Sequence, residues 1–424
     1  MANSNQQKRI LVYASWADIS SPALMGTLVV SITRGKEIFS FEYYNKWLES
    51  GFAQVLDPDL GLYSGPQYIR DDKANFGLFL DSSPDRWGRL LMKRREAAHA
   101  RNEGRENKTL FESDYLLGVF DGHRMGALRF KTDSNGEFLD DNKRNASPKW
   151  ASLRDLEYAS LQLEKDDILE DPEYFTWLNM LIAPGSSLGG ARPKSNVVDP
   201  SNELWIAKFP SSTDQINVGA WEMVTHQLAL EAGLNVAESR IQKFSSRHHT
   251  FLTKRFDRNS NGGRIHFASA LTMLGYKDGI SHTEGASYLE LAEFLIQNGA
   301  QVNTDLEELW RRIVFYICVS NTDDHLRNHG FILREDGWVL SPAYDINPVD
   351  TGSGLSLNIS EDDNSLDIDL AFEVAKYFRL NNTRANEIFN QVRDSVRQWR
   401  VISKGYGISS LEQDHMSRAF QATN

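Results

Sequence analysis

Cysteine is almost absent from this chain of 424 residues, which contains only Cys318. A single cysteine excludes a disulfide framework within the chain, and no Cys/His spacing typical of a zinc site occurs. Cys318 lies inside the apolar run 313–319, so we expect a buried thiol.

Long hydrophobic runs and an excess of positive charge are also missing. No apolar stretch reaches the ~20 residues that a membrane span needs, and the polar residues 1–8 precede no signal-peptide core. The net charge of −12 favours repulsion of nucleic acid by the chain as a whole. We therefore expect a protein of the reducing cytoplasm with no membrane partner.

The length predicts two domains, with three lobes in all. Residues 133–149 are rich in Asp, Asn, Ser and Gly and are typical of a boundary loop, so we expect a mixed α/β subdomain over residues 1–149. Its expected elements are strands at 10–14 and 28–32, a helix over 85–95 behind Pro84, and two short strands around the turn Asp121-Gly122.

The second half begins with a Gly-rich segment at 185–190 and continues with alternating strands and helices. The spacing predicts strands at 195–199 and 204–209, a helix over 220–231, and a strand pair ending at Lys254. Thr304 and Glu307 form a capping-box pattern that opens a helix, whose apolar residues follow helical spacing from Leu306 to Ile317 and which ends near Ser320-Asn321. A hairpin of residues 331–333 and 338–340 is expected around Asp336-Gly337.

Asp323 and Asn328 have the Asp-x-x-x-x-Asn spacing of a kinase catalytic loop. In phosphoryl transfer the Asp accepts the proton of the acceptor hydroxyl, and the Asn holds a magnesium ion. A second carboxylate ligand is needed nearby, and the predicted hairpin would return Asp345 to that place. Asp324 is a competing base, although it breaks the spacing to Asn328. His325 either holds the shape of the loop or donates to a phosphate oxygen.

Lys208 stands on a predicted strand between apolar neighbours. A lysine that grips phosphate needs such a rigid support, and it needs a carboxylate on the following helix to fix its ammonium group. Glu222 is the candidate partner. The alternatives are a solvent-facing Lys208 and a Glu222 that only stabilises the first turn of its helix.

Two further segments could contact a nucleotide. Glycines at 185, 189 and 190, followed by Arg192 and Lys194, would let backbone N–H groups approach phosphate, although the spacing matches neither common Gly-rich fingerprint and a turn without function stays open. At 253–258, backbone groups could contact adenine and Asp257 a ribose.

In combination these residues resemble the signature of HipA-type kinases. The resemblance rests on residues 118–128 (GVFDGHRMGAL), 187–194 (SLGGARPK), 206–210 (IAKFP), 255–258 (RFDR), 321–328 (NTDDHLRN) and 342–346 (PAYDI). It implies an α+β, two-lobed protein-kinase-like fold with an additional N-terminal α/β subdomain. The implied domains are the subdomain at 1–149, a kinase N-lobe at 150–258 and a mainly helical C-lobe at 259–424.

The resemblance also implies a serine/threonine protein kinase that uses ATP and Mg²⁺ and serves as the toxin of a toxin–antitoxin pair. Implied partners are a small helix-turn-helix antitoxin, through which DNA is reached indirectly, and a protein substrate such as an aminoacyl-tRNA synthetase. Asp323 resembles the catalytic base, Asn328 and Asp345 the magnesium ligands, and Lys208 the phosphate-binding lysine. The implied nucleotide-binding residues are Gly189, Gly190, Ala191, Arg192, Lys194, Lys208, Lys254, Phe256, Asp257, His325, Asn328, Tyr344 and Asp345.

Ser187 falls at the position that this family autophosphorylates, with Ser186 beside it as the alternative. Some members carry Gln-Glu before the lysine of the phosphate loop, and Lys254 stands where others have an acidic residue. Two other functions stay open: a non-catalytic corepressor that acts through a DNA-binding antitoxin, and a small-molecule kinase. A pseudokinase would be expected to lose one of the four central residues, and none is lost.

Overall fold

The computed structural model of the chain describes residues 7–16, 19–70, 73–142, 148–165, 171, 173–182, 190 and 192–423. The chain divides into two compact units. The first unit comprises Met1–Ala207 and Asp257–Ala268, and the second comprises Lys208–Phe256 and Ser269–Asn424. The three domains expected from the sequence stay a prediction. Among the described residues, no helix is both long and apolar enough to cross a membrane.

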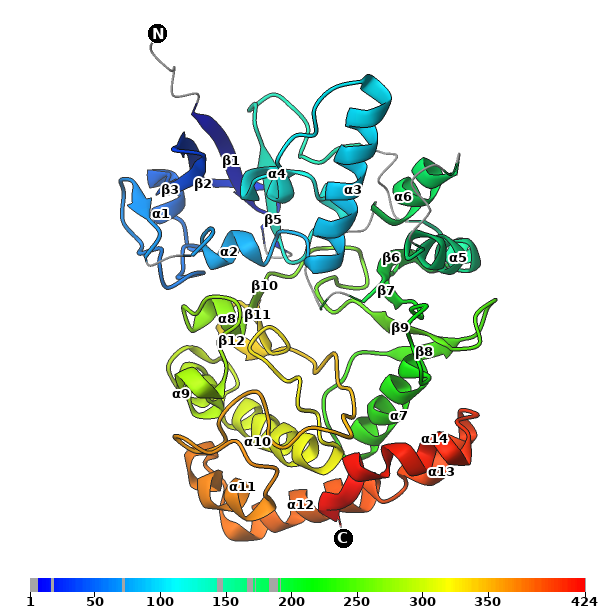
Figure 1. Cartoon of the computed structure of the whole chain (residues 1–424). Coiled ribbons are helices and arrows are strands. Elements are labelled where there is room, and N and C mark those ends of the chain that lie inside the picture. Colours follow the sequence, from blue (N-terminus) through cyan, green and yellow to red (C-terminus); the bar gives the residue numbers. More distant parts are fainter. Residues whose placement is uncertain are drawn as a thin grey trace. The chain divides into compact units, whose positions relative to one another are not determined.

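The first unit is built on a five-stranded antiparallel sheet with the order β4-β3-β2-β1-β5 (Figure 1). Its strands are β1 (Lys8–Ala14), β2 (Ala23–Thr33), β3 (Lys36–Tyr43), β4 (Gln67–Tyr68) and β5 (Leu128–Lys131). Alternate residues of β1, namely Ile10, Val12 and Ala14, are fully buried, as a strand with one face on a core requires. The tight β2–β3 turn is made by Arg34 and Gly35, which both have positive φ.

Helices complete the first unit: α1 (Asn45–Leu48), α2 (Gly77–Leu80), α3 (Arg86–Glu103), α4 (Glu112–Leu117), α5 (Leu153–Leu163) and α6 (Tyr174–Ile182). Helix α3 begins behind Asp85, whose side chain accepts the N–H of Gly88, and ends at Gly104 in the left-handed conformation. Strands β6 (Lys194–Val198) and β7 (Leu204–Lys208) follow as predicted, and β7 ends where the second unit begins.

The strand pair expected around Asp121-Gly122 is wrong. Residues Asp121–His123 form a short 3-10 turn, and of this segment only β5 is a strand. The reason is the buried guanidinium of Arg124, which donates to the carbonyls of Ser82, Leu116, Val119 and Leu139. The chain folds around this cation so that both terminal nitrogens of the guanidinium are bonded to backbone carbonyls, which prevents a flat hairpin.

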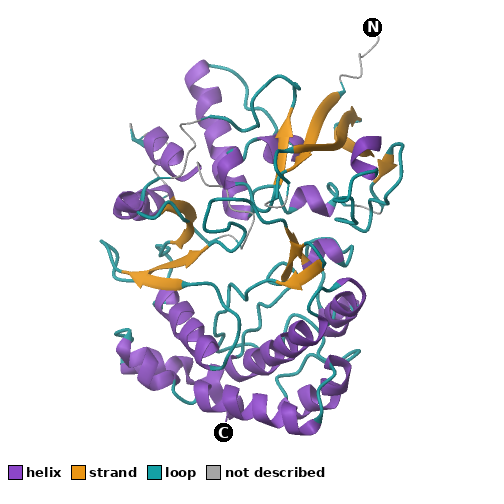
Figure 2. Cartoon of the chain, turned by 180° about the vertical axis from the view of Figure 1, so that it is seen from behind, coloured by secondary structure: helices purple, strands orange, loops and turns teal. Residues whose placement is uncertain are grey.

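The second unit is mainly helical (Figure 2). Its helices are α7 (Val218–Glu231), α8 (Ala270–Met273), α9 (Tyr288–Asn298), α10 (Val302–Val319), α11 (Ile368–Val374), α12 (Asn382–Val396), α13 (Trp399–Gly405) and α14 (Ser410–Met416). Strands β8 (Ser239–Gln242) and β9 (Thr250–Lys254) form an antiparallel pair, and so do β11 (Gly330–Arg334) and β12 (Gly337–Leu340). The short strand β10 (Phe267–Ser269) precedes α8.

Helix α10 is the central core helix of the second unit. Its residues from Leu309 to Val319 are all buried, and it packs against α9 and α12. The expected N-cap at Thr304 is wrong, because the helix begins two residues earlier at Val302, and the N–H of Asp305 already bonds to the Gln301 carbonyl. The helix ends at Ser320 in the left-handed conformation, which turns the chain into the loop 321–329.

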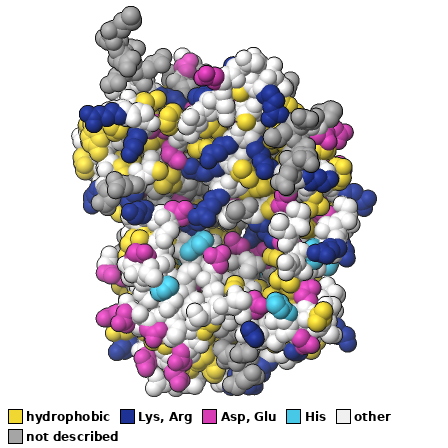
Figure 3. All heavy atoms as spheres, in the orientation of Figure 1, with side chains coloured by type: hydrophobic (Ala, Val, Ile, Leu, Met, Phe, Trp, Pro, Cys, Tyr) yellow, Lys and Arg dark blue, Asp and Glu magenta, His cyan; other side chains and the backbone are white. Residues whose placement is uncertain are grey.

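Charged side chains of both signs lie on the face of the molecule drawn in Figure 3, where they are scattered among uncharged residues. The buried Cys318 agrees with its expected place in a core helix, and burial raises the pKa of its thiol to about 12.

Candidate active site

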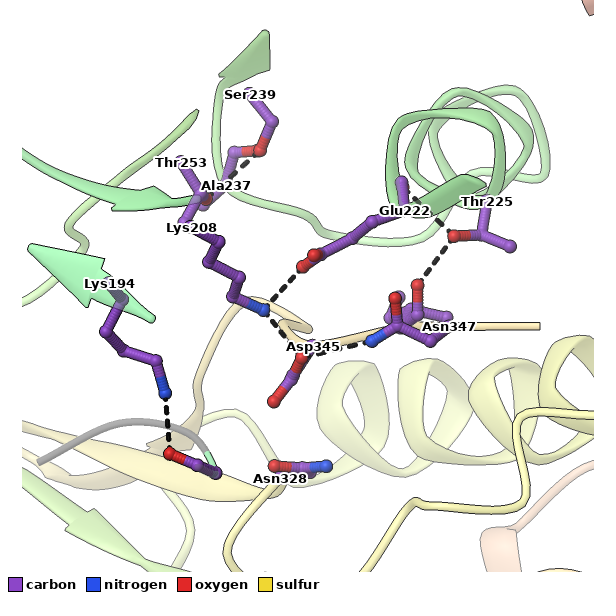
Figure 4. A network of polar contacts seen from close by, with 12 residues as sticks. Lys194, Lys208, Glu222, Thr225, Ala237, Ser239, Thr253, Asn328, Asp345 and Asn347 are labelled. Carbon is purple, nitrogen blue, oxygen red and sulfur yellow. Dashed lines mark hydrogen bonds and ion pairs between the residues drawn. The ribbon is translucent and has the colours of Figure 1, made fainter. Parts of the chain in front are cut away.

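Lys208 stands at the end of β7 and is almost fully buried, and its ammonium group contacts two carboxylates of the second unit. Its Nζ lies 2.6 Å from Glu222 Oε1 and 2.6 Å from Asp345 Oδ1 (Figure 4). Burial alone would lower the pKa of Lys208, but the charges of Asp345 and Glu222 outweigh it, and the net pKa is raised. The lysine therefore stays protonated and rigidly placed.

Glu222 reaches Lys208 because α7 presents it toward the end of β7. The helix begins behind Asn217, whose side chain accepts the N–H of Ala220 at 3.3 Å. Glu222 is buried, so its carboxylate needs a partner, and Lys208 supplies it. Of the two interpretations open from the sequence, the geometry favours the ion pair over helix-end stabilisation.

Asp345 occupies an unusual backbone position, with φ of 58°, in the segment that follows β12. Its Oδ1 also accepts a hydrogen bond from Asn347 Nδ2 at 3.1 Å. The Thr225 hydroxyl of α7 donates to the Ile346 carbonyl at 2.6 Å, and the N–H of Asn347 donates to Asn321 Oδ1 at 3.2 Å. Residues 345–347 are thus hydrogen-bonded both to α7 and to the loop 321–329.

Asn321, Thr225 and Asn347 were not found by sequence reasoning. The amide of Asn347, two residues after Asp345, was a local signal that could have been used. Thr225 carried none, because its partner lies 121 residues away in the chain.

The loop 321–329 presents Asp323 and encloses Asp324. The Asp323 side chain is 77% exposed, whereas Asp324 is fully buried. The Asp324 carboxylate accepts hydrogen bonds from the Tyr288 hydroxyl and from the N–H of Ser356. Burial raises the pKa of Asp324 to about 7. Of the two candidate bases, only Asp323 has a carboxylate that a substrate could reach.

Asn328 is locked into the same loop by its own amide. Its Nδ2 donates to the Asp323 carbonyl at 2.7 Å, and its N–H donates to the His325 carbonyl at 2.7 Å. Its Oδ1 is buried and has no hydrogen-bond partner among the residues that the structure describes. Figure 4 shows the Asp345 carboxylate pointing toward Asn328. A buried amide oxygen that accepts no hydrogen bond from the described residues suits a hard cation such as Mg²⁺.

Clusters of three or more His, Cys, Asp or Glu side chains that could hold a metal are absent from the part of the chain that the structure describes.

Further candidates in the second unit lie around two aromatic rings. The rings of Phe256 and Tyr344 have centroids 5.6 Å apart, and the Tyr344 hydroxyl donates to the Arg327 carbonyl at 2.7 Å. The N–H of Lys254 donates to the Glu238 carbonyl at 2.8 Å. His325 Nε2 lies 4.0 Å from Asp323 Oδ1.

The remaining candidates belong to the first unit. Lys194 is buried, and its Nζ lies 2.9 Å from both Asp85 Oδ2 and the Gly190 carbonyl. Asp257 is buried, and its Oδ2 accepts the N–H of Gly126 and a donor of Arg258. Arg192 is half-buried. The candidates Ser186, Ser187, Gly189 and Ala191 lie outside the described residues.

A lysine–glutamate pair, an Asp-x-x-x-x-Asn loop and a following aspartate together define a protein of the kinase-like α+β class. Residues 186–399 match the family described as the HipA-like C-terminal domain. The chain belongs to this HipA-like family.

Comparisons with individual proteins agree with this family. The chain is 26% identical over 179 residues to a Haemophilus influenzae protein named "Putative kinase", a match that covers 38% of this chain and 52% of that protein. It is 27% identical over 148 residues to "Putative kinase Y4mE" of Sinorhizobium fredii, covering a third of each. The matches thus span about half and a third of the length of these relatives.

The fold is that of a solved structure, the HipA of Shewanella oneidensis in complex with HipB and operator DNA. The TM-score is 0.64, the identity is 18%, and the match covers 98% of this chain and 95% of that chain. The α+β kinase-like fold class predicted from the sequence is confirmed.

Proposed function

We propose that this chain is a phosphotransferase that moves the γ-phosphoryl group of ATP, with Mg²⁺, to a serine or threonine of a protein. The observation that carries the proposal is the buried Lys208, held at 2.6 Å by both Glu222 and Asp345. A lysine fixed by a helix carboxylate beside a metal-type aspartate is the arrangement that protein kinases use to grip nucleotide phosphates.

The roles of the second unit's residues follow from their chemistry. The Lys208 ammonium would bind phosphate oxygens of the nucleotide. Asn328 and Asp345 would hold magnesium, which supplies charge neutralisation for the phosphates. The exposed Asp323 carboxylate would orient the acceptor hydroxyl and take its proton. His325 would keep the loop in shape or donate to a phosphate oxygen.

The nucleotide's base and sugar need other residues. We assign adenine to the backbone at Lys254 and to the rings of Phe256 and Tyr344. Asp257 remains the candidate for the ribose.

Lys194 follows the Gly-rich segment that we propose as the phosphate loop, and the structure suggests a supporting role for it. The charge of Lys194 is already matched by the buried carboxylate of Asp85, so we assign it the task of holding Gly190 in place. Backbone groups of Gly189, Gly190, Ala191 and Arg192 would then face the phosphates, with Ser187, or its neighbour Ser186, as the autophosphorylated residue.

The biological role is proposed from the family. The Shewanella relative was solved with HipB and operator DNA. We propose that this chain likewise acts as a cytoplasmic toxin with a small helix-turn-helix antitoxin and meets DNA only through that partner, which agrees with its net charge of −12. An aminoacyl-tRNA synthetase is the proposed class of substrate.

The test is transfer of labelled phosphate from γ-labelled ATP to the chain itself and to proteins of a cell extract. The native chain should transfer phosphate with magnesium present, and Lys208→Met should not. Lys376→Met, which changes an exposed lysine of the same unit, is the matched control. Equal transfer by Lys208→Met would refute the proposal, and label found only on a small molecule would replace a protein substrate with a metabolite.

A further inference from the structure

The second unit contains a cavity of about 460 Å³ apart from the Lys208 cluster. One wall is the turn between β8 and β9, which contributes Lys243, Arg247, His248 and His249. The opposite wall is the connection between α13 and α14, and Asn217 and Glu412 also line the space. Cavities that bind small ligands have volumes of roughly 300–1,000 Å³.

Arg247 on the first wall donates to the His248 ring at 2.9 Å and to the Asp214 backbone carbonyl at 2.8 Å. In the part of the chain that the structure describes, neither Arg247 nor Lys243 makes an ion pair with a carboxylate. Burial, together with the charges of Lys243 and His248, lowers the pKa of His249. Lys243 and Arg247 therefore leave this wall cationic.

Glu412 also lines the cavity, but in the described part of the chain it makes no ion pair with the first wall, because its carboxylate is held by α7. Its Oε1 accepts the backbone N–H of Asn217 at 2.8 Å and the indole N–H of Trp221 at 2.9 Å. This oxygen is thus directed to the first turn of α7, where a helix favours negative charge.

We propose that this cavity is a binding site for a phosphate monoester. An arginine and a lysine beside a concave surface offer several charge-assisted donors, the arrangement that favours a compact dianion over a carboxylate. The volume exceeds that of a phosphate ion, so it leaves room for the group that carries the phosphate. Two sources share this chemistry: a phosphorylated side chain of a protein and a free phosphorylated metabolite.

The site is connected to α7 by direct contacts. The His249 ring and Asn217 Nδ2 lie 2.8 Å apart, and the N–H of His249 donates to Asn217 Oδ1 at 2.9 Å. Asn217 is the N-cap of α7, and the same helix carries Glu222 to Lys208. Bound phosphate would restrain the β8–β9 turn, and through it the start of α7. If the proposed kinase function holds, occupancy would therefore raise the rate of phosphoryl transfer.

Binding is tested by titration calorimetry on the full chain without ATP, so that the result does not depend on kinase activity. The probes are inorganic phosphate, a phosphoserine peptide and its unphosphorylated form, at constant ionic strength. Phosphate and phosphopeptide should bind, and Lys243→Ala and Arg247→Ala should each weaken binding by about tenfold, the loss expected for a hydrogen bond to a charged group. Arg240→Ala is the matched control, because Arg240 lies on β8 outside the cavity and pairs with Glu238.

Tighter binding of the phosphopeptide than of phosphate would identify a protein as the source, and the reverse would identify a metabolite. Absence of binding by every phosphorylated probe, or equal loss in Arg240→Ala, would overturn the site. The coupling is tested separately by the rate of ATP turnover with and without phosphate. An increase that Arg247→Ala abolishes supports it, and an unchanged rate in an active enzyme refutes the coupling.

Discussion

The ammonium group of Lys208 lies 2.6 Å from the carboxylate of Glu222, and both side chains are buried. Asp345 contacts the same ammonium group at the same distance, so one cation holds two anions. Removing either carboxylate leaves the other as a partner, whereas removing the lysine leaves the buried Glu222 and the partly buried Asp345 without their shared cation.

Glu222→Gln should lower phosphoryl transfer by roughly tenfold or more, because Lys208 loses the partner that fixes its position. Its free energy of unfolding should fall by less than the roughly 3–5 kcal/mol typical of breaking a buried pair, since Asp345 remains. Kinase assays and urea unfolding measure the two effects. Glu231→Gln changes an exposed residue of the same helix and should alter neither phosphoryl transfer nor the free energy of unfolding. If Glu222→Gln also leaves phosphoryl transfer unchanged, Glu222 does not belong to the site.

Asp323 and Asp324 should respond in opposite ways to substitution. Asp323→Asn should lower turnover by roughly 10²–10⁴-fold while leaving nucleotide binding and stability unchanged, since the side chain is a positioned base on the surface. Asp324→Ala should cost about 1–3 kcal/mol of stability, because Tyr288 and the N–H of Ser356 lose their buried acceptor. If Asp324→Asn abolishes turnover without unfolding and Asp323→Asn is active, the assignment is reversed.

Asp324 should also make stability depend on pH. Burial raises its pKa from 3.8 to about 7, so the folded state binds a proton that the unfolded state has released. Its stabilising contribution is complete below the unfolded pKa and is lost as pH rises through about 7. Urea unfolding at pH 5 and pH 8 should show a larger loss of stability for the native chain than for Asp324→Asn. Identical pH slopes would contradict the raised pKa.

The magnesium assignment predicts that metal and Asn328 act together on nucleotide affinity. Asn328→Ala should weaken magnesium-dependent ATP binding by roughly tenfold or more. Loss of a residue that only supports a metal ligand already costs metal affinity of this size. Binding of ATP in EDTA should be weak and equal in both proteins. Calorimetry measures both affinities, with the exposed Asn386→Ala as the control. Equal magnesium dependence in Asn328→Ala would exclude its amide oxygen as a ligand.

The lone thiol offers a probe of the core. Cys318 is fully buried in α10, and burial raises its pKa to about 12, so very little thiolate forms near neutral pH. A thiol reagent should label the folded chain far more slowly than the chain in urea. Fast labelling without denaturant would show that α10 is accessible.

The sequence predicted the elements whose pattern is local. The hairpin β11–β12 was expected because two apolar runs flank Asp336-Gly337, and α10 because its apolar residues recur at helical spacing. The beginning of α10 was misplaced, since a capping-box pattern at Thr304 cannot show that the preceding residues already form a helical turn.

Contacts between distant residues could not be predicted in the same way. The pair of Lys194 and Asp85 joins residues 109 positions apart, and no local pattern links them. Arg124 likewise orders its surroundings through carbonyls from four separate positions. The loop with Asp323 and Asn328 could be predicted because the Asp-x-x-x-x-Asn spacing is visible in the sequence. Thr225 and Asn347 could not, because their contacts form only when distant segments fold together.

The contact between Glu412 and the beginning of α7 has a consequence for biosynthesis. Asn217, which donates its N–H, is synthesised 195 residues before Glu412, which accepts it. The ribosome therefore completes Lys208, Glu222 and Asp345 while the helix that carries Glu222 still lacks this anchor. The beginning of α7 therefore gains this contact only after α14 has emerged from the ribosome, later than every residue of the Lys208 cluster.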